Sequence, residues 1–243
     1  MIHFIDVDGA FSSETQKLFA GDQNCVSYTA RVESLERGNT AFVSPANSIG
    51  FMDGGIDLIY SRVMFPGVEQ RVRAKVRNIG AVNQLGRRYL PIGSAMLTVV
   101  DEIANTALIT SPTMLLPQPV QTTRNAYYSM FAALSVVTEW NKRCPVSQRF
   151  STLVVPALCC GYGGMSAAQA ASQVHRAHVD FGANPDRYPA KATWHMDGLT
   201  VLFEHPLEEQ PPFYENTEWF EVPLERITMR NNASAERMGV HLL

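Results

Sequence analysis

The sequence alternates short, almost purely apolar segments with longer helical ones over most of its 243 residues. We expect strands at residues 2–7, 25–30, 40–44, 95–100, 107–110, 153–157 and 200–203, and helices at 12–19, 55–64, 68–79, 123–142 and 167–181. Strands without a polar face are typical of a sheet that helices cover on both sides. The alternation therefore predicts an α/β fold, a three-layer α/β/α sandwich around a mixed, mostly parallel central sheet.

The composition excludes several classes of function. A chain of 26.9 kDa is long enough for one sizeable core. Its formal net charge of -3 gives no electrostatic footprint for general nucleic-acid binding. No apolar segment reaches the roughly 18 residues of a membrane helix, and the N-terminus does not read as a secretory signal. The four cysteines have neither zinc-knuckle nor redox spacing, so we expect a reducing, cytoplasmic location.

Two glycine-bearing loops each follow an apolar strand. The first occupies residues 44–57 and ends in Asp53-Gly54-Gly55-Ile56-Asp57, and the second occupies residues 156–165. Glycine lets a backbone come close to a ligand, and a helix N-terminus offers unpaired N–H groups to an anion. Ligands of such sheets bind beyond the carboxyl ends of the strands, where both loops are expected. The two loops together predict a site for a diphosphate, and so for a nucleotide-like ligand.

These loops resemble the ligand loops of macrodomains. Residues 44–47 read Ser-Pro-Ala-Asn and residues 53–57 read Asp-Gly-Gly-Ile-Asp, where the family has Asn-Ala-Ala-Asn and Gly-Gly-Gly-Val-Asp. Residues 156–164 fit the family pattern Pro-Ala-x-x-x-Gly-x-x-Gly, and residues 93–98 are similar to its Gly-x-Ala-x-x-Thr segment. The resemblance covers roughly residues 26–203. It implies ADP-ribose or an ADP-ribosylated substrate as the ligand, and it requires no metal or redox cofactor.

The resemblance also implies roles for individual residues. Asn47 would orient the distal ribose, and Asp57 or Asp53 would position the attacking water. Glu33 occupies the position that matches the acid that accepts the adenine amino group in the family, whereas Asp53 stands where the family has glycine. The expected ligand-binding residues are Glu33, Ser34, Ala46, Asn47, Phe51, Gly54, Gly55, Ile56, Cys160, Gly161, Tyr162, Gly163, Gly164 and Met165.

Several of these residues also have a purely structural interpretation. Glu33 would then be a solvated strand-end acid, Asn47 the cap of a local turn, and Asp57 a favourable charge at a helix N-terminus. His175 and His178 are three residues apart on a predicted helix, but no third metal ligand is evident beside them. We interpret them as surface histidines and expect no metal site.

The chain divides into a predicted macrodomain-like domain, residues 1–205, and a C-terminal extension, residues 206–243. Prolines and aromatic residues mark the extension, which is expected to pack on the domain, bind a protein partner or mediate self-association. The favoured function is hydrolysis of mono-ADP-ribosyl conjugates or of O-acyl-ADP-ribose. Two alternatives remain open: a reader module that binds ADP-ribose without turnover, and a structural protein that retains the fold.

Overall fold

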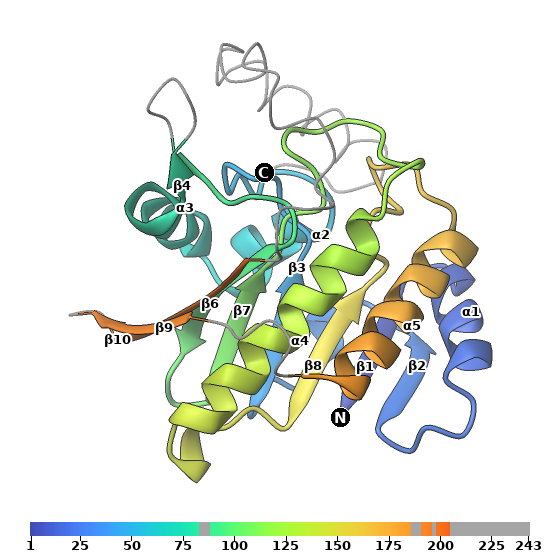
Figure 1. The fold of residues 1–243 in the computed structure, drawn as a ribbon, viewed down its shortest axis with the longest axis horizontal. Helices are drawn as coiled ribbons and strands as arrows, with labels where there is room; N and C mark the ends of the chain where they lie inside the picture. The colour runs from blue at the N-terminus through green and yellow to red at the C-terminus, as the bar shows by residue number, and fades with distance from the viewer. Residues whose placement is uncertain (83–87, 186–190, 196–197, 205–243) are drawn as a thin grey trace.

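The structure is a computed structural model that describes residues 1–82, 88–185, 191–195 and 198–204, so the predicted extension at 206–243 lies outside the described residues (Figure 1). The strands are β1 (Ile2–Asp6), β2 (Cys25–Thr29), β3 (Thr40–Ser44), β4 (Ala81–Val82), β5 (Arg88–Tyr89), β6 (Ser94–Asp101), β7 (Thr106–Thr110), β8 (Thr152–Pro156), β9 (Lys191–His195) and β10 (Gly198–Glu204). The α-helices are α1 (Ala10–Leu18), α2 (Gly55–Leu58), α3 (Val68–Ile79), α4 (Asn125–Arg143) and α5 (Ala167–Ala183). Short helical turns of other types are η1 (Val32–Ser34), η2 (Ile59–Met64) and η3 (Val146–Gln148). None of the helices in the described part of the chain has the length and hydropathy to span a membrane.

Eight strands form one sheet in the order β2-β1-β8-β3-β7-β6-β10-β9. The neighbours from β2 to β7 are parallel, whereas β6, β10 and β9 are joined to them and to one another in antiparallel fashion. This arrangement confirms the predicted mixed, mostly parallel sheet. Each of the seven predicted strands is present to within two residues at either end, whereas β4, β5 and β9 were not predicted.

The strand order brings the two glycine loops together. Strand β8 lies between β1 and β3, so the second glycine loop, after β8, is next to the first, after β3. From β1 the chain goes outward to β2 at one edge, whereas after β3 it goes to β6 and then to β7, on the side of the other edge. Such a reversal of winding opens a crevice at the carboxyl ends of the strands. The topology therefore places both loops at one crevice.

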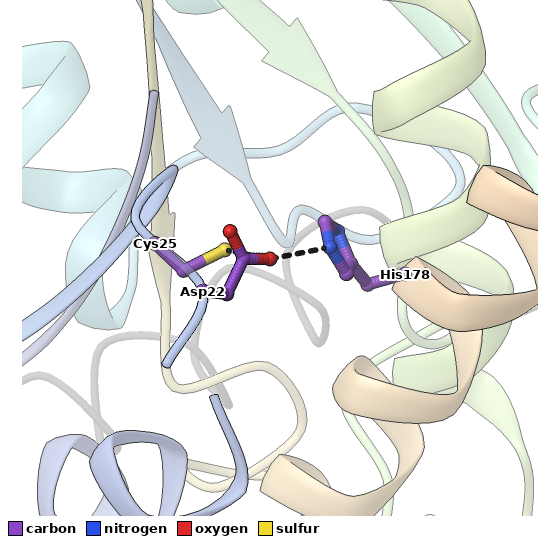
Figure 2. A group of neighbouring side chains, drawn as sticks. All are labelled: Asp22, Cys25 and His178. Carbon is purple, nitrogen blue, oxygen red and sulfur yellow. Dashed lines mark hydrogen bonds and ion pairs between the residues drawn. The ribbon is translucent and has the colours of Figure 1, made fainter. Parts of the chain in front are cut away.

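Helices cover both faces of the sheet. Helices α1, α4 and α5 lie on one face, while α2, η2 and α3 lie on the other (Figure 1). Helix α5 packs against both α1 and α4. Toward the C-terminal end of α5, the His178 Nε2 atom lies 3.1 Å from a carboxylate oxygen of Asp22, in the turn before β2 (Figure 2). The predicted three-layer architecture is confirmed.

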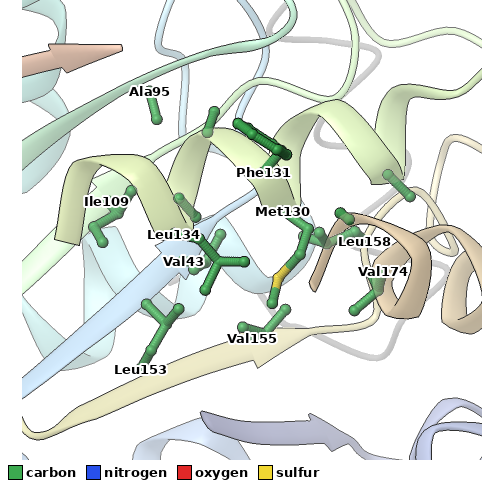
Figure 3. Close-up of a cluster of buried hydrophobic side chains, with 14 of the residues drawn as sticks. Val43, Ala95, Ile109, Met130, Phe131, Leu134, Leu153, Val155, Leu158 and Val174 are labelled. Carbon is green, nitrogen blue, oxygen red and sulfur yellow. The ribbon is translucent and has the colours of Figure 1, made fainter. Parts of the chain in front are cut away.

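The apolar core is divided in two by the sheet because successive strand side chains point to opposite faces. Val43 and Val155 belong to the cluster under α4 and α5, together with Met130 and Leu134 of α4 (Figure 3). The preceding residue of β3, Phe42, belongs to the opposite cluster with the side chains of η2 and α3. Burial on both faces explains why these strands read as continuous apolar segments.

The predicted helix at 55–64 is two structures in succession. Helix α2 is only four residues long and continues directly into the π-helical turn η2. The Phe65 N–H bonds to the Tyr60 carbonyl at 2.8 Å, as the wider turn requires. The Tyr60 hydroxyl donates to the Val43 carbonyl at 3.2 Å, and the Ser61 hydroxyl donates to the Met52 carbonyl at 2.6 Å. These two buried bonds fasten the turn to β3 and to the first glycine loop.

Candidate functional site

A pocket of about 550 Å³ lies at the carboxyl ends of the parallel strands. Its walls come from five segments at or after the ends of strands: residues 5–11 at β1, 30–33 at β2, 45–59 at β3, 113–117 at β7 and 156–167 at β8. The volume is in the usual range for small-molecule sites, about 300–1,000 Å³. Both glycine loops contribute to one pocket, as their positions in the sequence predicted.

Most of the predicted site residues line this pocket. They are Glu33, Asn47, Phe51, Gly54, Gly55, Ile56, Asp57, Cys160, Gly161, Tyr162, Gly163 and Met165. Four others are not part of its lining. Ala46 and Asp53 are buried, Ser34 is exposed and bonds the Arg31 carbonyl, and Gly164 adopts a left-handed backbone conformation with φ at 67°. The structure thus gathers twelve predicted residues from three separate segments.

The two loops present unbonded backbone N–H groups. In the first loop, the amides of Gly55, Ile56 and Asp57 form the first turn of α2, where a helix has no internal acceptor for them. In the second loop, the amides of residues 161–163 have no acceptor among the residues that the structure describes. Successive free N–H groups of this kind form a concave site for an anion. Arg31 is the one basic side chain in the described lining. The backbone amides are therefore the main hydrogen-bond donors that the pocket offers to an anion.

Gly163 has no room for a side chain. A Cβ there would lie 2.6 Å from the Cys159 carbonyl oxygen and 2.8 Å from Val120 Cγ2. The Gly163 carbonyl also accepts the Val120 N–H at 2.8 Å, which draws the loop against the segment before α4. Gly161 differs, because a Cβ at that position meets nothing within 4 Å. The loop needs glycine at 163 for packing, whereas Gly161 borders open space in the pocket.

Asn47 closes the first loop on itself. Its side-chain oxygen accepts the Ile49 N–H at 3.1 Å and the Phe51 N–H at 3.3 Å, and its amide nitrogen donates to the Phe51 carbonyl at 3.2 Å. The local-turn interpretation of Asn47 is therefore confirmed. Asn47 also lines the pocket, and an amide nitrogen carries two hydrogens.

Asp57 is a buried carboxyl with a strongly altered acidity. It is 8% exposed, and it accepts a hydrogen bond from the Ser44 hydroxyl at 2.5 Å. Burial raises the pKa of Asp57 to about 7, and the charges of Asp53 and Glu69 act in the same direction, while the bond from Ser44 opposes them. Asp57 is the acidic residue in the first turn of α2, as the helix N-terminus interpretation expects, and α2 continues directly into η2. A carboxyl that titrates near neutral pH beside a pocket is suited to proton transfer.

Phe51 forms the wall of the pocket near Asn47. Its ring packs with Leu115 and Leu116, and the Arg73 guanidinium lies 3.9 Å from the ring centroid. That stacking is a cation–π contact, which restrains the ring from the side of α3. Phe51 thus seals the loop against the core and faces the pocket at the same time.

The end of the pocket near β1 and β2 is acidic. Glu33 pairs with Arg31 at 2.6 Å, and both line the pocket. Asp6 and Asp8 also line it and were missed by the sequence analysis. The Asp6 carboxylate accepts the N–H groups of Phe11 and Ser12 at the start of α1, at 2.7 Å and 3.3 Å. An acidic residue at the carboxyl end of a mainly apolar strand was the available signal for Asp6.

Cys160 lines the same end of the pocket. Burial raises the pKa of its thiol to about 12, and the charges of Asp6 and Asp8 raise it as well. A thiol with this pKa is protonated at neutral pH and is a poor nucleophile. The side chain therefore contributes shape to the pocket.

Comparisons with known proteins give limited similarity. No family model matches the chain. A curated protein of Aquifex aeolicus (strain VF5), described as uncharacterized, is 28% identical over 123 residues, which are 51% of this chain and 62% of that relative. The matched segment thus spans less than two thirds of the relative. A solved macrodomain of Oceanobacillus iheyensis, a glycine-to-valine mutant with ADPR, is similar with a TM-score of 0.47 and 18% identity, over 63% of this chain and 75% of that one.

Proposed function

We propose that this protein binds ADP-ribose or a close derivative and hydrolyses mono-ADP-ribosyl conjugates or O-acyl-ADP-ribose. The observation that carries the proposal is a pair of backbone amide rows, at residues 55–57 and 161–163, that border one pocket and bond to no acceptor among the described residues. Backbone amides bind a diphosphate without basic side chains, which suits a lining with a single arginine in its described part.

The order of the strands gives the bound nucleotide a direction. The two amide rows follow β3 and β8, so the diphosphate would occupy the middle of the pocket. The adenosine would then lie toward the ends of β1 and β2, where Glu33, Asp6 and Asp8 offer acceptors for the adenine amino group. The distal ribose would lie toward Asn47 and Phe51, on the side of β7. The second hydrogen of the Asn47 amide is suited to bind a ribose hydroxyl.

Asp57 supplies the base that hydrolysis needs. With a pKa of about 7, its carboxylate is partly deprotonated at neutral pH and basic enough to take a proton from water. The water oxygen would bond to the electrophilic carbon of the distal ribose, or of its acyl group, as the bond to the leaving group breaks and Asp57 takes the proton. Asp53 is outside the pocket lining and would act on this step through its charge on Asp57.

Calorimetric titration with ADP-ribose, and with AMP and NAD as comparators, tests the binding proposal. We expect wild-type protein to prefer ADP-ribose over both comparators. Gly161→Val fills open space in the pocket and should weaken ADP-ribose binding at least ~10-fold with little change in stability. Gly38→Val is the matched control, because a Cβ at Gly38 also meets nothing within 4 Å and Gly38 is not part of the lining. Equal affinity of wild type and Gly161→Val for ADP-ribose would refute the proposed site.

Turnover of a mono-ADP-ribosylated peptide and of O-acetyl-ADP-ribose tests the hydrolase proposal. We expect Asp57→Asn to lose most of the rate and to keep its affinity for ADP-ribose, because the amide is isosteric and cannot act as a base. Wild-type protein that binds ADP-ribose and turns over neither substrate would be a reader, and the proposed hydrolysis would be wrong.

A further inference from the structure

We propose that Asp22, Cys25 and His178 form a binding site for Zn²⁺, separate from the pocket of the proposed function. The three side chains come from the turn before β2, the first residue of β2 and helix α5 (Figure 2). Among the described residues, these three side chains have potential metal-ligand atoms that lie close enough together to share one ion. His178 thus has neighbours that its position in the sequence did not reveal, because Asp22 precedes it by 156 residues.

The distances between the three donor atoms suit a small ion. Asp22 Oδ2 lies 3.5 Å from Cys25 Sγ and 3.1 Å from His178 Nε2, and all three donor atoms lie within 4.8 Å of one another. Tetrahedral Zn²⁺ has ligand bonds of about 2.0–2.3 Å, which places its ligand atoms about 3.3–3.8 Å apart. The two separations from Asp22 Oδ2, 3.1 Å and 3.5 Å, are at or within 0.2 Å of that range, so small side-chain rotations bring the three atoms around one ion.

The backbone holds two of the ligands in place. The Asp22 N–H bonds to the Phe19 carbonyl at 3.0 Å, and the Cys25 N–H bonds to the Asp22 carbonyl at 3.2 Å. The Asn24 N–H bonds to Asp22 Oδ1 at 2.9 Å, so the turn binds one oxygen of the carboxylate. The other oxygen, Oδ2, faces Cys25 and His178. The Phe19 ring meets the His178 ring edge-on, with centroids 5.2 Å apart, and restrains it. The site is therefore largely preformed.

The chemistry of the donors favours Zn²⁺ over harder ions. A thiolate and an imidazole are ligands of zinc, whereas Mg²⁺ and Ca²⁺ take oxygen ligands. All three side chains are partly buried, and a recess of about 430 Å³ that includes Asp22 and Cys25 in its lining opens beside them. That recess gives access to the ion and room for a water as its fourth ligand.

The position of the site points to a structural role. Cys25 begins β2, and the far end of this five-residue strand is next to the nucleotide pocket, about 13 Å away at ~3.3 Å per residue. An ion here would not touch a ligand in that pocket. It would join the edge strand β2 to helix α5. A bound ion that links residues 156 apart in the chain reduces the conformational entropy of the unfolded chain strongly. We therefore expect zinc to raise thermal stability without changing ADP-ribose affinity.

Cobalt substitution tests the coordination directly. Full-length protein is treated with chelator under reducing conditions and titrated with Co²⁺, whose bond to a thiolate gives a charge-transfer absorption. We expect this band in wild type, its loss in Cys25→Ser, and its retention in His175→Gln and Cys144→Ser. His175 is a matched control, because it is one turn away on α5 and its ring also packs on Phe19. Absence of the band in wild type, or its persistence in Cys25→Ser, would overturn the proposal.

Calorimetry with Zn²⁺ gives a second, independent measurement. We expect one ion per chain, release of protons because the thiol binds as a thiolate, and at least ~10-fold weaker binding in Asp22→Asn and His178→Gln. The melting temperature of wild type should rise with Zn²⁺ concentration, and that of Cys25→Ser should not. Zinc affinity that is the same in these variants as in wild type would refute the site, whether or not ADP-ribose binds.

Discussion

Replacing Asp57 by asparagine should stabilise the protein, and the gain should grow with pH. Asp57 has a pKa of about 7 in the folded protein, against an ordinary value of 3.8. The folded state therefore holds this proton more tightly than the unfolded state does, and stability falls as pH rises from about 4 to 7. Above pH 7 the cost of ionising Asp57 in the folded state reaches about 4 kcal/mol.

The asparagine variant removes this cost and keeps the local structure. The new side chain would offer an amide oxygen to the Ser44 hydroxyl, which now donates to the Asp57 carboxylate at 2.5 Å. At pH 5 most of the wild-type side chain is already protonated, so the variant gains less there. We expect the stability gain of Asp57→Asn at pH 8 to exceed its gain at pH 5 by about 2–3 kcal/mol.

Urea unfolding followed by tryptophan fluorescence at pH 5, 6, 7 and 8 measures this difference. Other titrating groups cancel because wild type and variant are compared at each pH. Glu14→Gln, at an exposed salt bridge on α1, is the acid-to-amide control and should change stability by less than about 0.5 kcal/mol at every pH. A gain that is the same at pH 5 and pH 8, or a loss at pH 8, would refute the assigned acidity of Asp57.

Two further predictions concern the second glycine loop and the hydrogen bond from Ser44 to Asp57. Gly163→Ala should destabilise the protein by about 1–3 kcal/mol in thermal or urea unfolding, because the new methyl group meets the Cys159 carbonyl oxygen at 2.6 Å. Gly161→Ala is its control and should leave stability within about 0.5 kcal/mol, so equal effects of the two would contradict the packing argument. Ser44→Ala removes the bond that lowers the pKa of Asp57, so the pH at which stability stops falling should move upward. An unchanged or lower pH for that point would show that the bond has no such effect.

Local sequence pattern was sufficient for most of the fold. Strands such as β3 and β8 are buried on both faces, so their apolar composition identified them within a residue or two. The glycine loops were identified for the same reason, since backbone that must approach a ligand or pack closely requires glycine locally. The helix predicted at 55–64 was partly wrong, because buried bonds from Tyr60 and Ser61 accompany a π-helical turn that a helical periodicity does not reveal.

Within the candidate site, the sequence indicated which residues would line the pocket, but not their hydrogen bonds or their burial. It identified Asn47 and Asp57 through motif resemblance, yet the turn-closing bonds of Asn47 and the burial of Asp57 depend on contacts with Phe51 and Ser44. Asp6 was missed, because only the strand order places the end of β1 beside the glycine loop of β8.

The sequence by itself determined the layers of this protein and the two loops, since periodicity and glycine placement act over a few residues. The tertiary structure alone decided which strands are neighbours, how acidic Asp57 is, and that His178 meets Asp22 and Cys25. The physical reason is that strand order, desolvation and metal-ligand geometry depend on groups far apart in the chain. The interactions between these groups form only when the chain folds and brings them together.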